Sequence, residues 1–92
     1  MITKTSFGTI EILLEKNGEI ITELLTFQKE GRGHIHNNWE ICYILDGSGV
    51  IVNGDKKVEV TKGDVCKIPP KTNHWMIPSD YLEILIVYSD KA

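Results

Sequence analysis

"GHIHNNWEICYILDG", residues 33 to 47, contains two of the three histidines of this 92-residue chain. His34 and His36 are separated by one residue, and Glu40 follows four positions after His36. Because side chains alternate between the faces of a β-strand, an unbroken strand here would direct all three side chains to one side. This spacing suits neighbouring ligands of a single ion. The stretch therefore predicts a metal-ligating strand that continues into the apolar residues 41 to 45.

Turn signals and β-rich runs alternate along the rest of the chain, which predicts an all-β protein. Asn17-Gly18 and Asn53-Gly54 are strong hairpin signals, and Pro69-Pro70 cannot continue a strand. The glycines at 47 and 49 are interpreted as a further turn. No window shows a sustained helical period, so we expect a sandwich or barrel in a single domain, residues 1–92. The expected strands cover residues 9–15, 20–27, 41–45, 50–52, 56–60, 65–68 and 82–89.

Composition excludes several classes of function. The formal net charge is -3 and no block of like charge is present, which argues against binding to nucleic acid. No apolar run reaches the roughly 18 residues of a membrane-spanning helix. The N-terminal stretch lacks the features of a secretory signal. Cys42 and Cys66 are interpreted as reduced, buried thiols of a cytoplasmic protein, with a disulfide as the alternative that only geometry decides.

A second motif surrounds the third histidine. "KGDVCKIPPKTNH", residues 62 to 74, places a glycine, a proline and a histidine at fixed spacing. Together with the first stretch, it resembles the two motifs of the cupin family, and the resemblance extends over about residues 20 to 88. The matching positions are His34, His36, Glu40 and Gly47 in the first motif and Gly63, Pro69 and His74 in the second. Three positions depart from the family pattern, namely Gln28, Lys71 and Pro78.

The resemblance implies a jelly-roll, double-stranded β-helix barrel. It also implies that His34, His36, Glu40 and His74 hold one divalent transition metal. Imidazole and carboxylate ligands suit Mn, Fe, Co, Ni, Cu or Zn better than Ca or Mg. Four protein ligands on an octahedral ion would leave two positions for water, dioxygen or a chelating substrate. The alternative is a cupin barrel whose residues form only a polar pocket.

Two classes of function remain open. The first is a small metal-dependent enzyme that carries out dioxygenase-like oxidation, or isomerisation, of a small oxygenated molecule. The second is a non-catalytic cupin module that binds or senses a small ligand. No dedicated general acid or base is expected, because Glu40 is used by the metal and no other acidic residue is placed in the cavity. Trp39 and Tyr88 are interpreted as packing residues, whereas Trp75 fits packing and the barrel mouth equally well.

A homodimer is expected from two strands that are apolar on both faces. Residues 41–45 contain only apolar side chains, and residues 82–88 are interrupted only by Glu83. An apolar outer face needs to be covered. A second copy of the chain is the expected partner.

Overall fold

The computed structural model describes residues 1–91, which form seven antiparallel strands. No helix in this part of the chain is long and apolar enough to cross a membrane. The strands are β1 (Ile2–Lys4), β2 (Gly8–Lys16), β3 (Glu19–Phe27), β4 (Trp39–Asn53), β5 (Lys56–Thr61), β6 (Val65–Ile68) and β7 (His74–Ser89). The expected all-β class is confirmed.

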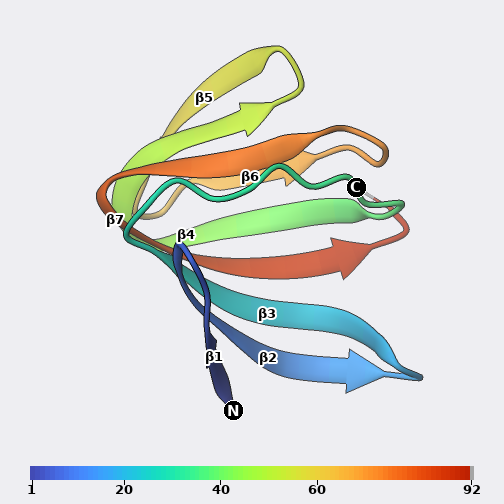
Figure 1. Cartoon of the computed structure of the whole chain (residues 1–92). Coiled ribbons are helices and arrows are strands. Elements are labelled where there is room, and N and C mark those ends of the chain that lie inside the picture. Colours follow the sequence, from blue (N-terminus) through green and yellow to red (C-terminus); the bar gives the residue numbers. More distant parts are fainter. Residues whose placement is uncertain (92) are drawn as a thin grey trace.

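Two long strands, β4 and β7, form the frame of the molecule. Both bend near the left of the view in Figure 1, so each belongs to two layers. The first half of β4 pairs with the second half of β7, beside β3 and β6. The second half of β4 pairs with the first half of β7 on one side and with β5 on the other. The inner faces of the two layers enclose the core.

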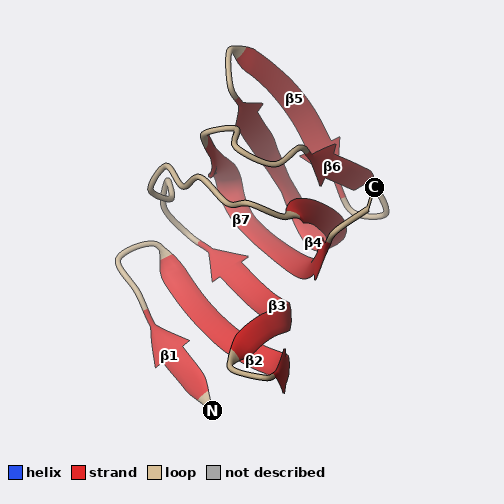
Figure 2. Ribbon diagram, turned by 90° about the vertical axis from the view of Figure 1, so that its right-hand side faces the viewer, coloured by secondary structure: helices blue, strands red, loops and turns tan. Residues whose placement is uncertain are grey.

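The hydrogen-bonded sheet is open. The pairing path is β1-β2-β3-β7-β4-β5, with β6 attached to β4, and within residues 1–91 no pairing joins β1 to β5. Figure 2 shows β1, β2 and β3 grouped at one end of this path and β5 at the other. The folded-over sheet agrees with a cupin jelly roll, but the closed barrel expected from the sequence is not formed by these pairings.

Both hairpin predictions are confirmed, whereas the predicted turn at residues 47–49 is wrong. Asn17 and Gly18 have φ of 52° and 79°, as a tight hairpin requires, and Gly54 turns β4 into β5 with φ of 64°. β4 runs without interruption through Gly47. Instead of a turn, the glycines there form bulges in the pairing of β4 with β7. Pro78, one of the three residues that depart from the family motifs, lies opposite Gly49 at the same irregularity. Proline is tolerated in a strand at such a bulge.

Alternation along the two long strands explains the core. In β7, Leu82, Ile84 and Ile86 are at most 1% exposed, and they alternate with more accessible residues. In β4, Cys42 and Ile44 are buried as predicted. They alternate with Tyr43 and Leu45, which are 39% and 41% exposed and cover the outer face. Leu14 of β2 is likewise 52% exposed, so a second apolar surface lies at the other end of the sheet.

The two cysteines face each other across β4 and β6. Cys42 is the register partner of Cys66, and both are buried and unbonded. Burial raises the pKa of the Cys42 thiol, and the charge of Glu40 raises it further. A thiol that stays protonated is a poor nucleophile, which supports the interpretation that the two cysteines serve in packing. The cytoplasmic location expected from these thiols stays a prediction.

Candidate metal site

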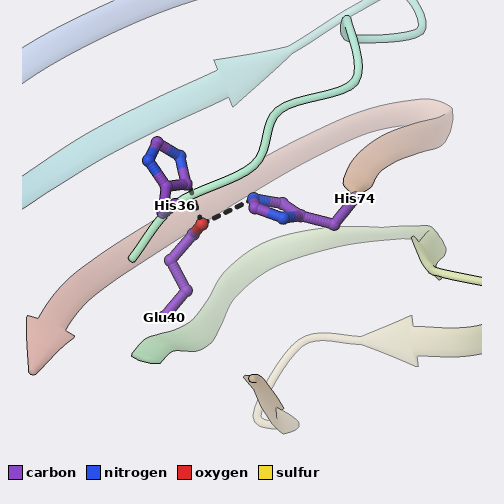
Figure 3. A group of neighbouring side chains, drawn as sticks. All are labelled: His36, Glu40 and His74. Carbon is purple, nitrogen blue, oxygen red and sulfur yellow. Dashed lines mark ion pairs between the residues drawn. The ribbon is translucent and has the colours of Figure 1, made fainter. Parts of the chain in front are cut away.

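Three of the four predicted ligands converge between the two layers. Glu40, the second residue of β4, is 2% exposed, and His74, the first residue of β7, is 3% exposed. His36 is half-buried in the segment that connects β3 to β4. One nitrogen or carboxylate oxygen from each residue lies within 4.8 Å of the others. Figure 3 shows both imidazoles beside the Glu40 carboxylate. These residues are called the His-Glu-His cluster below.

The short contact between His74 and Glu40 requires a proton or a metal ion between the two side chains. His74 Nδ1 lies 3.0 Å from the carbonyl oxygen of Thr72, which can only accept a hydrogen bond, so Nδ1 carries the proton. In the neutral ring, Nε2 would then direct a lone pair at Glu40 Oε2, only 2.5 Å away. A proton or a metal ion on Nε2 removes this repulsion.

The buried Glu40 carboxylate has an oxygen that is available to a shared ion. In the described part of the chain, no donor meets the buried Glu40 Oε2 at hydrogen-bonding geometry, despite the short distance to His74. Burial alone would lower the pKa of His74, but the contact with Glu40 and its negative charge outweigh burial and raise that pKa. The raised pKa favours the protonated His74 ring when no metal is bound. The mixed nitrogen and oxygen donors suit a divalent transition metal.

His36 is held by a backbone contact to the second motif. Its carbonyl oxygen accepts a hydrogen bond of 2.7 Å from the N–H of Lys71, and its Nε2 lies 3.4 Å from Glu40 Oε2. Lys71 has φ of 60°, a conformation that favours glycine, and it stands where the family motif has glycine. The departure at Lys71 therefore preserves the turn, with backbone strain at this residue.

His34 lies beside the cluster but outside it. The expectation of one unbroken strand from His34 to Glu40 is wrong, because β4 begins at Trp39. Instead, His34 forms an isolated bridge with His74, with backbone N···O distances of 2.9 and 3.0 Å. Its exposed ring lies 5.9 Å from the ring of His36. Burial, and then the charges of His36 and His74, lower the pKa of His34, which keeps the ring neutral as ligation requires.

A cavity of about 170 Å³ adjoins the cluster and is called the site cavity below. Besides the four predicted ligands, its lining includes Glu23, Tyr88 and Arg32 and a largely apolar wall. The apolar wall consists of Phe7, Ile10, Leu25, Phe27, Met76 and Ile86. Trp39 and Trp75 are half-buried and do not line it. The wall limits access of water to the cluster.

Two residues of the site cavity were missed by sequence reasoning. Glu23 is a second buried acidic residue there, which contradicts the expectation that Glu40 is the only one. Tyr88 was interpreted as packing, yet it lines the cavity and hydrogen-bonds to Glu23. The signal available was alternation in residues 20–27, which puts Glu23 on one face with Leu25 and Phe27.

The sequence matches the cupin domain model over residues 23–88. The acireductone dioxygenase of Leptospira biflexa is 43% identical over 58 residues, covering 59% of this chain and 33% of that enzyme. An uncharacterized protein of Methanocaldococcus jannaschii is 34% identical over 91 residues, covering 79% of this chain and 73% of that protein. The match thus covers only about a third of the Leptospira enzyme.

Solved structures show the same fold. A predicted oxalate decarboxylase from Thermotoga maritima has a TM-score of 0.78 at 26% identity, covering 88% of this chain and 78% of that one. A cupin-like protein from Thermotoga maritima has a TM-score of 0.80 at 19% identity, covering 97% and 80%. The sequence match, the shared fold and the two motifs lead to one conclusion. The chain belongs to the cupin domain family.

Proposed function

We propose that this cupin domain binds one divalent transition metal and uses it in dioxygenase-like chemistry on a small oxygenated molecule. The observation that carries the proposal is the convergence of two imidazoles and a carboxylate whose shared oxygen lacks a hydrogen-bonding partner in the described chain. His34, next to the cluster, would complete the ligand set. Similarity to acireductone dioxygenases supports the reaction class.

Each residue of the site has a definite role in this proposal. When bound, the ion would supply Lewis acidity and, for a redox-active metal, access to dioxygen chemistry. Glu40 balances part of the positive charge, and the Thr72 carbonyl orients the His74 ring. The apolar wall excludes water from one side of the site cavity.

The direct test combines metal analysis with oxygen uptake. The purified chain is stripped of metal, reloaded with Fe, Mn, Ni, Co, Cu or Zn, and supplied with an acireductone. We expect one ion per chain and oxygen uptake that depends on the metal and is lost in His36→Ala. Tight ligand binding without oxygen uptake or any other turnover would instead support a binding or sensing module.

Metal binding is expected to weaken as the pH falls. The raised pKa of His74 means that a proton stays on its ring to higher pH than usual, and the ion must displace this proton. That protonated ring stabilises the metal-free fold at low pH, a contribution lost as pH rises through the raised pKa. The gain in melting temperature on adding metal should therefore begin to shrink at a pH above the usual histidine pKa of about 6.5, and shrink further as the pH drops. A gain that stays constant down to pH about 4 would contradict imidazole ligation.

We also propose that the chain forms a homodimer through the outer face of β4 and β6. Tyr43 and Leu45 of β4 and Val65 of β6 expose 39%, 41% and 53% of their surface there. Register places Tyr43 opposite Val65, so these side chains form one continuous patch. A patch of this kind is typical of an interface.

Sedimentation at micromolar concentration tests this interface. Tyr43→Lys is expected to raise the dissociation constant of the dimer by at least about 10-fold, because it places a charge in an apolar contact. Leu14→Lys alters the other apolar surface and serves as the matched control. A wild-type monomer, or a dimer weakened only by Leu14→Lys, would refute the assignment.

A further inference from the structure

Glu23 is a buried carboxylate that the metal chemistry does not use. It is 7% exposed and faces the site cavity from β3. Within residues 1–91, no lysine or arginine lies within ion-pair distance of it. Because burying an unpaired charge is unfavourable, such a carboxylate needs hydrogen-bond donors. The sheet supplies only one of them.

That donor is Tyr88 of β7. Its hydroxyl donates to Glu23 Oε1 at 2.5 Å, and burial, followed by the charge of Glu40, raises the pKa of Tyr88 so that the proton stays on the hydroxyl. A tyrosine has a single proton to donate. The described residues give Glu23 Oε2 no hydrogen bond, and this oxygen is not fully buried, so a donor from solvent or from a ligand can reach it.

Strand register places this pair beside the His-Glu-His cluster. Tyr88 is the direct partner of Glu40 across β4 and β7, and Glu23 is the partner of Ile86, two residues earlier in β7. Partners across antiparallel strands share a face, so Glu23, Tyr88 and Glu40 lie across one inner surface. The Tyr88 ring also meets the His36 ring edge-on, with centroids 5.4 Å apart. One small molecule can therefore contact both the cluster and Glu23.

The remaining wall of the site cavity defines the kind of molecule. Its volume of about 170 Å³ is well below that of sites for drug-sized ligands. Apolar side chains cannot satisfy the polar groups of a ligand. The Glu23 carboxylate, by contrast, can accept a hydrogen bond from a ligand hydroxyl at Oε2, and a hydrogen bond to a carboxylate is stronger than one to a neutral acceptor.

We propose that Glu23 is a specificity-determining residue, oriented by Tyr88, that accepts a hydrogen bond from a hydroxyl group of the substrate. The substrate class is a small polyhydroxylated or ene-diol molecule, with vicinal oxygens at the metal and one further hydroxyl at Glu23. This inference rests on the proposed metal-binding function and adds the chemistry that selects the substrate.

Two matched chelators test the inference without any turnover. Tropolone offers two vicinal oxygens, and α-hydroxytropolone adds one hydroxyl beside them. The chain is loaded with cobalt, and the change in the visible bands of the ion reports binding of each probe. In wild-type protein, the preference for α-hydroxytropolone over tropolone should exceed that of Glu23→Leu by about 10-fold or more. Glu23→Gln, which keeps a neutral acceptor, should retain part of this preference.

Leu25→Val is the matched control, because Leu25 lies on the same strand and lines the same cavity. It should change the affinity for both probes by the same factor. Equal preferences in wild type and Glu23→Leu, or no binding of either probe to the cobalt-loaded chain, would overturn the inference while leaving metal binding intact. If Glu23→Leu does not fold, equal preferences in wild type and Glu23→Gln overturn it. Failure of the wild-type chain to take up cobalt would refute the proposed function, and this inference with it.

Discussion

Replacing His74 by alanine is expected to lower the metal affinity by at least about 100-fold, since loss of an outer partner of a metal ligand already costs about 10–100-fold. His74 is the most buried of the three histidines, and its ring is oriented by the Thr72 carbonyl. The loss therefore removes a preorganised ligand that no neighbouring group can replace. Competition with a fluorescent chelator measures the affinity.

His34→Ala provides the matched comparison, because His34 lies outside the His-Glu-His cluster. It should reduce affinity less than His74→Ala does. His74→Ala also leaves the Glu40 carboxylate buried without its partner, so His74→Gln, whose amide can donate to that carboxylate, serves as a second variant. Unchanged affinity in both His74 variants, with the fold intact, would show that the ion does not bind here.

Gly47→Ala is expected to destabilise the fold by about 3 kcal/mol or more. Gly47 has φ of 80°, where a β-carbon is strained. An added β-carbon would also overlap the carbonyl oxygen of Tyr81 in the backbone of β7. Neither strand can move away easily, because β4 and β7 are paired on both sides of this point. Urea unfolding measures the change in the free energy of unfolding.

Gly63→Ala separates the two causes of this effect. Gly63 has φ of 95°, but an added β-carbon there would meet nothing within 4 Å. Its substitution should cost about 1–3 kcal/mol from backbone strain alone. Equal losses at the two positions would contradict the proposed clash with Tyr81.

The sequence predicts local elements of this fold better than the course of the long strands. Asn17-Gly18 and Pro69-Pro70 restrict the backbone at those residues, so the strand ends beside them are predictable. Gly47 carries the same local signal as a turn, yet it forms a bulge. The difference is set by pairing with β7, far along the chain, which no local pattern encodes.

The candidate site likewise combines residues that local patterns predict with residues that only long-range pairing places. Strand spacing pointed to His36 and Glu40, and the resemblance to the second cupin motif added His74. The structure brings these three residues together, although His36 reaches the cluster from a connecting segment and not from the predicted strand. Glu23 was missed because its partner Tyr88 is 65 residues away, and alternation alone does not say which face of β3 is inward. Placing Glu23 in the cavity requires the register between β3 and β7.

The sharing of β4 and β7 by both layers has a consequence for cooperativity. Neither layer can detach as a separate unit, because separation would break the same two strands in their middle. Amide hydrogens along both halves of these strands should thus exchange with solvent at similar rates, through global unfolding, and more slowly than those of the edge strands β1 and β5. Glu40 and His74 lie in these two strands, so two of the three residues of the His-Glu-His cluster are anchored in the part of the sheet that both layers share.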